Sequence, residues 1–281
     1  MHPLHSLPFS CSFDVDATPQ LIHEPIGHMK YKILLVTSGH ATATVMNHTY
    51  ALSRGSLLFI GRLESHSIQI QHPPYTRYVV TLSMDTLLNS VRDNHLLAIF
   101  LHHPASFQHL VQLDETTLSN ILPYFQHLLH ECREQAPYYE ETCTSWFHLF
   151  LIELYRLFPQ AFPKWSNCIT RTAVVAAQQY MAQQFHRQIT LNEVAEHVFV
   201  SRHTLSLAFR DAVGMTFKDY LILLRLTEAK RLLLTTDLPV SKIGEAVGYT
   251  NVNNFIETFR KHLHTTPLQY RLHQRSSYLE V

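Results

Sequence analysis

Two stretches of the chain repeat one another: LNEVAEHVFVSRHTLSLAFRDAVGMTFKDY at residues 191–220 and VSKIGEAVGYTNVNNFIETFRKHLHTTPLQY at residues 240–270. They match position for position once Thr250 is treated as an insertion. Each copy predicts a short apolar helix, a tight turn, a polar N-cap residue and a second helix with apolar residues four positions apart. This is the pattern of a helix-turn-helix, whose second helix enters the DNA major groove. The repeat therefore predicts two adjacent major-groove contacts with double-stranded DNA.

A long helix is predicted between the two copies. Thr216 is suited to cap its N-terminus, and at about 1.5 Å per residue the segment 217–234 would be roughly 27 Å long. A rigid helix of this length can hold two recognition helices about 34 Å apart, which is one turn of B-DNA. An apolar stripe, expected to pack the helix between the two copies, consists of Leu226, Ala229 and Leu233.

The two halves of the chain differ in charge, although 22 Lys and Arg balance 22 Asp and Glu over 281 residues. Residues 168–281 contain 13 basic and 9 acidic residues, and residues 1–167 contain 9 basic and 13 acidic residues. A mildly basic half joined to an acidic half is consistent with a nucleic-acid module that carries a separate control domain. The length also fits two domains.

The segment from about Val174 to Arg271 resembles the DNA-binding domain of the arabinose-regulator (AraC-type) family of bacterial transcription regulators. The resemblance is carried by ITLNEVAEHVFVSRHTLSLAFRDAVGMTFKDYL, by LRLTEAKRLLLTT and by VSKIGEAVGYTNVNNFIETFRKHLHTTPLQYR. The last of these is the most specific, because it combines I-x-x-x-x-G-Y, a helix ending in F-R-K, and T-P-x-x-Y-R. The resemblance implies a sequence-specific regulator that forms a homodimer and contacts RNA polymerase.

The same resemblance implies which residues face the DNA. Asn253 can pair bidentately with adenine, His203 can meet a guanine edge and Glu257 can accept a hydrogen bond from cytosine. The groove-facing positions are Arg202, His203, Ser206 and Leu207 in the first recognition helix and Val252, Asn253, Ile256 and Glu257 in the second. Phosphate contacts, which fix the register without reading the sequence, are expected from Ser201, Arg210, Lys242, Asn251 and Arg260.

The chain departs from the family pattern in two places, on the second recognition helix and at Gly244. Ile256 and Glu257 stand where small polar and basic residues are common, so the second helix either binds loosely or reads thymine methyl groups. Gly244 replaces the usual Ala within a helix, at a cost of up to about 1 kcal/mol.

The N-terminal half has the pattern of an antiparallel β domain. Short β-branched and aromatic runs alternate with turn signals such as Ser38-Gly39 and Pro73-Pro74. The runs lie at residues 31–37, 42–45, 49–52, 56–60, 66–70 and 77–81. Strands at this spacing predict a sandwich or barrel, and residues 31–83 look like the cupin-type jelly roll that AraC-type regulators often carry as a sensor. The expected fold class is therefore α+β.

Two amphipathic helices are predicted after the strands, at residues 117–134 and 139–157. The resemblance suggests that they pair two protomers, whereas their broad apolar stripes would equally serve to cover the sheet and one another. We expect an arm at 1–20, a cupin-like sensor at 21–113, a helical dimerisation or packing segment at 114–158, a linker at 159–168 and an all-helical DNA-binding domain at 169–281.

The sensor is expected to bind a small-molecule effector rather than a metal. Cupin enzymes hold a metal with a His-x-His pair followed by a Glu and a His. Within the cupin-like segment that begins at Tyr31, only the isolated His40 and His48 precede Glu64, so neither a metal nor another cofactor is expected. The adjacent His102 and His103 are taken to point to opposite sides of a strand. Candidate residues for an effector pocket are Arg62, Glu64 and His66.

No stretch approaches the roughly 18 consecutive apolar residues of a membrane span, and the N-terminus lacks the pattern of a signal peptide. The four cysteines show no C-x-x-C spacing, so neither a disulfide framework nor a thiolate zinc site is indicated. These features predict a cytoplasmic, nucleoid-associated protein that does not associate with membranes.

The sequence predicts a ligand-responsive, non-enzymatic transcription regulator. In the family, activation is the commonest direction and carbohydrates are the commonest effectors, so genes of carbohydrate utilisation are the expected targets. Two alternatives stay open at this point: a cupin metalloenzyme fused to a DNA-binding module, and a regulator whose barrel only dimerises.

Overall fold

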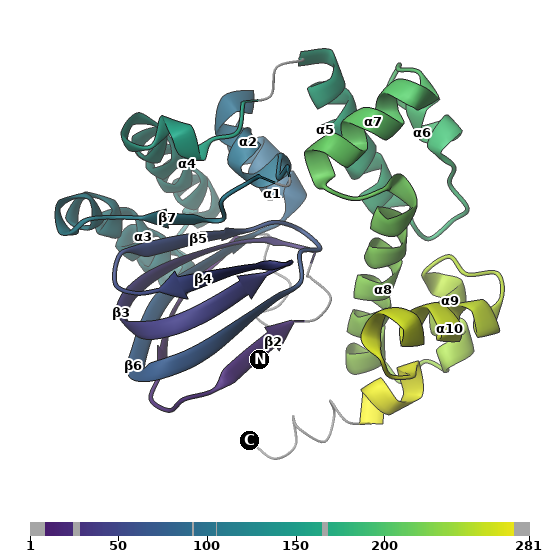
Figure 1. The fold of residues 1–281 in the computed structure, drawn as a ribbon, viewed down its shortest axis with the longest axis horizontal. Coiled ribbons are helices and arrows are strands. Elements are labelled where there is room, and N and C mark those ends of the chain that lie inside the picture. The colour runs from purple at the N-terminus through teal and green to yellow at the C-terminus, as the bar shows by residue number, and fades with distance from the viewer. Residues whose placement is uncertain (1–8, 25–28, 92, 105, 165–167, 273–281) are drawn as a thin grey trace. The chain divides into compact units, whose positions relative to one another are not determined.

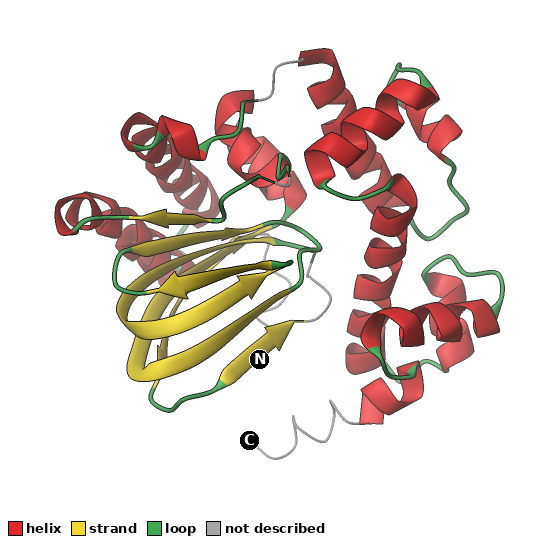
Figure 2. Ribbon diagram, in the orientation of Figure 1, coloured by secondary structure: helices red, strands yellow, loops and turns green. Residues whose placement is uncertain are grey.

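A computed structural model describes residues 9–24, 29–91, 93–104, 106–164 and 168–272 (Figure 1). These residues form two compact units, an N-terminal one up to residue 164 and a C-terminal one from residue 168. Strands occur only in the first unit among the described residues, and the second unit is all-helical (Figure 2). The expected α+β fold class is confirmed. No helix within the described ranges is long and apolar enough to cross a membrane.

The N-terminal unit is built on one antiparallel sheet, whose long strands β3 and β6 curve together in Figure 1. The strand order is β1-β6-β3-β5-β7, with β2 paired to β6 and β4 paired to β3. Its strands are β1 (Phe9–Asp16), β2 (Leu21–Glu24), β3 (Tyr31–Val45), β4 (His48–Leu52), β5 (Ser56–Ile60), β6 (His66–Leu82) and β7 (Leu110–Gln112). The curved sheet encloses a buried apolar cluster that includes Leu34, Val36, Val45, Leu58, Ile68 and Ile70.

Two expected turns are instead bends within continuous strands. Ser38-Gly39 lies within β3, Pro73-Pro74 lies within β6, and the pairing register of the two strands shifts between Val36 and Ala41. Gly39 has φ +81°, and a Cβ atom there would lie 2.7 Å from the carbonyl oxygen of Pro74. Glycine therefore lets the two bent backbones meet at a β-bulge, where a side chain would not fit.

The sheet also begins earlier in the chain than expected. Residues 9–16 were expected to belong to an N-terminal arm, but they form β1 and pair along their whole length with β6, from Phe9 opposite Leu82 to Asp16 opposite Tyr75. The alternation of Phe9, Cys11 and Phe13 with polar residues provides the apolar face that this pairing needs. Residues 1–8 of the expected arm lie outside the described residues.

Helices cover the sheet after β6. They are α1 (Met84–Ser90), α2 (Asn94–Leu101), α3 (Glu115–Glu134) and α4 (Tyr139–Leu157), followed by the short 3-10 helix η1 (Pro159–Ala161). The apolar stripes of α3 and α4 pack on each other, with the rings of Phe125 and Phe150 5.2 Å apart, and the Cys11 thiol of β1 points to the carbonyl of Phe125. The stripes are thus buried within one protomer, as expected if the two helices cover the sheet and one another.

The same helix pair brings two cysteines together. The Sγ atoms of Cys132 on α3 and Cys143 on α4 lie 3.8 Å apart, and both are free thiols. The spacing of the cysteines in the sequence could not predict this proximity, because it results from the antiparallel arrangement of the two helices.

The C-terminal unit contains the two predicted helix-turn-helix motifs and the helix between them. The first motif consists of α6 (Leu191–His197) and α7 (Arg202–Val213), and the second of α9 (Val240–Ala246) and α10 (Val252–Leu263). The supporting helices are α5 (Cys168–Gln184) and α8 (Phe217–Thr235). The predicted N-caps are confirmed, since the side chains of Ser201, Thr216 and Asn251 accept backbone N–H groups of their helices.

The turns of the two motifs share a left-handed backbone position but fill it differently. The second motif has Gly248 with φ +92°, and the first has Phe199 with φ +57° and its side chain 94% exposed. A bulky residue in this conformation is strained, typically by about 1–2 kcal/mol. Because the Phe199 ring is exposed, packing within the chain does not offset this strain.

Replacing Phe199 with Gly should stabilise the C-terminal unit by about 0.5–1 kcal/mol, because relief of the left-handed strain exceeds the entropic cost of glycine. Chemical denaturation would measure the change in the free energy of unfolding. Phe199→Ala is the matched control, since it removes the ring but keeps the Cβ atom. Equal stabilisation by both variants would show that the ring, rather than the backbone conformation, is responsible.

Candidate nucleic-acid interface and sensor site

The first recognition helix, α7, presents its predicted face to solvent. Arg202, His203, Ser206 and Leu207 are exposed, whereas Leu205 and Phe209 are fully buried. This division follows the helical period, since buried residues four positions apart place the remaining residues on the opposite side. The exposed face is therefore available to a groove, and it combines a guanidinium, an imidazole, a hydroxyl and an apolar side chain.

The second recognition helix, α10, differs at one predicted position. Val252, Asn253 and Glu257 are exposed, and Phe255 and Phe259 are fully buried. Ile256 is half-buried and packs against the core cluster that contains these two rings. Its departure from the small polar residues of the family thus has a structural reason, because the side chain contributes to the packing of the second motif.

Three of the five residues predicted to touch phosphate have side-chain contacts within their own motif. Ser201 and Asn251 cap α7 and α10, with Ser201 Oγ 3.0 Å from Thr204 N and Asn251 Oδ1 2.8 Å from Asn253 N. Lys242 Nζ lies 2.7 Å from Glu245 Oε2 in a fully exposed ion pair, which contributes little to stability. Arg210 and Arg260 are exposed in the last turns of their helices.

A buried arginine connects the two motifs. Arg225, on α8 and 8% exposed, donates from Nε to the carbonyl of Phe185 and from Nη2 to that of Arg187, each at 2.9 Å. Its guanidinium also lies over the ring of Tyr249 in the second motif, 5.3 Å from the centroid. Burial lowers the pKa of Arg225. One side chain therefore ties the loop before α6 to the turn of the second motif.

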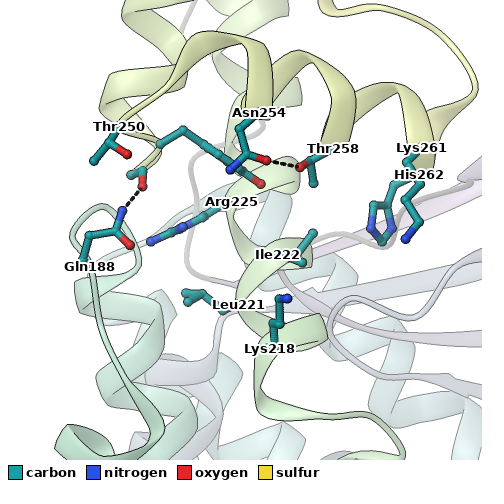
Figure 3. A pocket seen from close by; sticks show the side chains of 12 residues that line it. Gln188, Lys218, Leu221, Ile222, Arg225, Thr250, Asn254, Thr258, Lys261 and His262 are labelled. Atoms are coloured by element: carbon teal, nitrogen blue, oxygen red, sulfur yellow. Dashed lines mark hydrogen bonds between the residues drawn. The ribbon is translucent and has the colours of Figure 1, made fainter.

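Two further contacts strengthen this connection. Gln188 Nε2 donates to the carbonyl of Gly248 at 2.8 Å (Figure 3). A Cβ atom on Gly248 would lie 2.6 Å from the carbonyl oxygen of Phe185, so only glycine permits the approach. The I-x-x-x-x-G-Y pattern thus has a physical basis, since its glycine allows the contact and its Tyr249 receives the guanidinium.

A groove of about 430 Å³ lies beside these contacts, between α8 and α10. Lys218 and Lys261 line it and are exposed, and the pKa of His262 is lowered by burial and by Lys261. Figure 3 shows Lys218 on α8 and the side chains of Lys261 and His262 on α10. Neither lysine could be predicted as a groove residue from the sequence, because no motif indicates that α8 and α10 contribute cations to the same groove.

The three residues predicted to line an effector pocket are buried but turn towards different partners. Arg62 Nη1 lies 2.7 Å from Met84 Sδ. The ring of His66 lies 3.5 Å from Lys32 Nζ and 3.4 Å from the carbonyl of Glu64. The carboxylate of Glu64 points instead to two histidines that the sequence analysis did not select, His103 and His109.

Glu64, His103 and His109 form a cluster of titratable side chains, each of which is at most 10% exposed. His103 Nδ1 lies 2.5 Å from Glu64 Oε1, and His109 Nε2 lies 3.3 Å from Glu64 Oε2. Burial opposes the charge of Glu64, but the two histidines hold the pKa of its carboxyl well below the usual value. Burial likewise opposes the charged form of His103, but Glu64 and the carbonyl of Ile99 raise its pKa.

The expectation that His102 and His103 lie on a strand is wrong. His102 is the C-cap of α2, and His103 follows in a non-regular segment. This segment directs the His103 ring to Glu64 and stacks it on Phe107, with centroids 3.9 Å apart.

A cleft of about 550 Å³ lies between α2 and α4. Apolar side chains alternate in it with titratable ones, and the lining residues are Asp93, His95, Leu96, His148, Ile152, Tyr155 and Arg156. This cleft could not be predicted from the sequence, because the sequence pattern indicated neither α1 nor α2, and α2 forms one of its walls.

Comparison with known families decides the identity of the chain. Residues 194–273 match the family described as a helix-turn-helix domain, and residues 16–122 match the family described as an AraC-like ligand binding domain. The chain belongs to the AraC-type family of transcription regulators. The two matched segments fall within the two compact units described above.

Individual AraC-type relatives are distant but extend over most of the chain. A lactose operon transcription activator of Staphylococcus xylosus is 24% identical over 85% of this chain and 82% of its own length. The transcriptional activator RhaS of Pectobacterium carotovorum is 26% identical over 92% of this chain and 91% of its own length. An HTH-type regulator of Staphylococcus aureus is 23% identical over 84% of this chain, which spans only 30% of that longer protein.

The fold is similar to that of a protein of solved structure, ToxT. ToxT from Vibrio cholerae gives a TM-score of 0.63 at 14% identity, covering 95% of this chain and 98% of ToxT. A structure of ToxT with a bound unsaturated fatty acid gives a TM-score of 0.62 over 94% of each chain. The protein is thus an AraC-type DNA-binding transcription regulator with a ligand-binding domain. The family is not one of enzymes, and the hypothesis of a fused cupin metalloenzyme is set aside.

Substitutions on α10 and α9 should separate base recognition from positioning. Asn253→Ala should cost about 1–3 kcal/mol on the preferred site and relax one base position, because it removes a bidentate base contact. Lys242→Ala should weaken binding to all sequences alike. It should also lower the slope of the logarithm of the affinity against the logarithm of the salt concentration by nearly one unit. Binding to a library of single-base variants at several salt concentrations would measure both effects. Identical effects of the two substitutions on specificity would refute these roles.

Arg225→Met should lower the free energy of unfolding by about 1–3 kcal/mol, because it leaves the carbonyl groups of Phe185 and Arg187 without their donor. It should also weaken binding to DNA with two adjacent subsites more than binding to a single subsite, because the second motif is no longer held in place. Arg231→Met is the matched control on the same helix, since Arg231 is exposed and pairs with Glu228 at the surface. Equal losses from both substitutions would contradict the connecting role of Arg225.

Proposed function

We propose that this AraC-type regulator is a ligand-responsive activator of carbohydrate-utilisation genes. It acts in the cytoplasm, on the nucleoid, as a homodimer that contacts RNA polymerase. The lactose operon activator of Staphylococcus xylosus and the activator RhaS support the direction of regulation, and the former also supports the effector class. The observation that carries the DNA-binding part is the exposure of Arg202, His203, Asn253 and Glu257 on two recognition helices that Arg225 connects.

The effector is proposed to bind within the N-terminal unit, near Arg62, Glu64 and His66. These polar side chains are buried at one end of an otherwise apolar sheet interior. A largely apolar interior with a few buried polar groups is typical of small-molecule sites. Effector binding would change how the sensor presents the two DNA-binding motifs of the dimer, and hence the occupancy of the promoter.

A lipid-like effector is the second candidate, because one structure of the similar ToxT contains an unsaturated fatty acid. The cleft between α2 and α4 suits such a ligand, with Arg156 and His95 near the apolar Leu96 and Ile152. A sensor that only dimerises is the third candidate. The buried stripes of α3 and α4 leave Leu149 and Leu157 exposed for such a contact.

Genome-wide footprinting of the full-length protein would test the proposed function. Bound promoters should lie upstream of carbohydrate transport and catabolism genes, and transcription from them should rise when one sugar of a panel is added. Fatty acids of different length and unsaturation form the second arm of the panel. Bound promoters without any response to either arm would favour the sensor that only dimerises, and a lack of preferred promoters would contradict the function altogether.

His66→Ala should abolish the response to the effector while DNA binding persists at temperatures where the variant is folded. Because His66 is buried and hydrogen-bonded, its removal should also cost about 1–3 kcal/mol of stability. Melting with and without the effector separates the two effects, since a ligand raises the midpoint only where its site survives. His72→Ala, at an exposed position of the same strand, is the control. A His66→Ala variant that responds like the wild type would remove His66 from the effector site.

A further inference from the structure

The cluster of Glu64, His103 and His109 has the composition and geometry of a metal site. One ligand atom from each residue lies within 4.8 Å of the others. The three residues come from two segments, because Glu64 lies in the connection between β5 and β6, whereas His103 and His109 lie at the two ends of the connection between α2 and β7. The folded chain therefore assembles a set of two imidazoles and one carboxylate that no spacing in the sequence indicates.

The outer nitrogen of each imidazole has a partner that directs the inner nitrogen towards Glu64. His103 Nε2 donates to the carbonyl of Ile99 at 2.8 Å, so its Nδ1 faces the carboxylate. His109 Nδ1 lies 3.0 Å from the hydroxyl of Tyr50, so its Nε2 faces the same carboxylate. Histidines that bind metals show this arrangement, in which a carbonyl or hydroxyl fixes the tautomer and the ring orientation.

The carboxylate is held equally firmly. The backbone N–H of Gly61 donates to Glu64 Oε2 at 2.5 Å, and a Cβ atom on Gly61 would lie 2.9 Å from the carboxyl carbon. Phe107 closes the cluster from another side, stacked on His103 and edge-on to His109 with centroids 4.9 Å apart. The three side chains are at most 10% exposed, so bulk water has little access to the cluster, which strengthens the binding of a cation.

We propose that Glu64, His103 and His109 bind one divalent transition-metal ion of the Zn²⁺ type. Two neutral imidazoles and one carboxylate form a set of three protein ligands that Zn²⁺ adopts with a fourth position left open for solvent. Mg²⁺ and Ca²⁺ are disfavoured because they prefer oxygen ligands. Atoms bound to one tetrahedral ion at about 2.0–2.1 Å lie roughly 3.3 Å apart. Insertion of the ion therefore requires a shift of less than about 1 Å in the closest pair of ligands.

The site differs from the His-x-His arrangement of cupin enzymes, which the chain lacks. It also goes beyond the proposed function, which requires no metal. A bound ion would tie the segment around His103 and His109 to the connection that carries Glu64 and leads into β6 at His66. It would thus stabilise the end of the sheet where the effector is proposed to bind.

Metal binding should be measured on the untagged, full-length protein, because the chain contains 21 histidines and a tag would add more. After treatment with a chelator, the protein is titrated with Zn²⁺ in competition with a chromophoric chelator, and Co²⁺ provides visible absorption that reports the ligand geometry. The wild type should bind one Zn²⁺ per chain and give the intense Co²⁺ bands of a tetrahedral site. Zn²⁺ should also raise its melting temperature.

Three groups of variants make the test specific. Glu64→Gln, His103→Gln and His109→Gln should each weaken Zn²⁺ binding at least about 100-fold and abolish the Co²⁺ bands. Tyr50→Phe removes only the hydroxyl that orients His109, and it should weaken binding about 10- to 100-fold. The double substitution of His40 and His72 by Gln is the matched control, since these exposed rings lie 5.8 Å apart on β3 and β6 and should not matter.

Circular dichroism and melting of the metal-free proteins verify that each variant is folded. If a ligand variant does not fold, Tyr50→Phe and the Co²⁺ spectrum of the wild type still decide the question. Absence of stoichiometric binding by the folded wild type would overturn the proposal and leave the cluster as a buried ion pair. The proposal would also be overturned if the ligand variants bound Zn²⁺ as tightly as the wild type, or if the control with His40 and His72 replaced lost Zn²⁺ binding.

Discussion

Arg225 fixes the geometry on which DNA binding depends. The helix α8 sets the separation of the two helix-turn-helix motifs, but a single helix leaves their relative rotation undetermined. Arg225 removes this freedom because its guanidinium binds the carbonyls of Phe185 and Arg187 and lies over the ring of Tyr249. A buried guanidinium is costly unless its donors are satisfied, so the interaction favours one arrangement over neighbouring ones. The two exposed faces thus reach DNA already oriented.

Local patterns predicted the C-terminal unit well. Helix period, N-cap residues and Pro or Gly signals depend on only a few neighbouring residues. They therefore predicted α6, α7, α9 and α10 together with the caps Ser201 and Asn251. The half-burial of Ile256 was not predictable, because it depends on neighbours from other helices. From helix propensity alone, Gly244 was predicted to destabilise its helix. In the fold, a Cβ atom there would lie 3.1 Å from the ring of Phe255, so glycine permits close packing of α9 on α10.

The N-terminal unit shows why the sequence predicts strands better than sites. Gly39 and the Pro73-Pro74 pair were interpreted as turns, whereas the sheet uses them as paired bends in β3 and β6. The omission of α2 had a larger consequence, since it placed His103 on a strand and hid its approach to Glu64. Glu64 is far from both histidines in the sequence, and only the pairing of β5 with β7 brings His109 to the connection after β5.

The central claim is that two motifs, held in one orientation, bind adjacent major grooves on the same face of DNA. The most direct measurement is the affinity of the full-length protein for its selected operator before and after insertion of about five base pairs, half a helical turn, between the two subsites. The account predicts that the insertion lowers the affinity to that of DNA with one subsite. An unchanged affinity would contradict the account, because it would show that the motifs bind independently of one another.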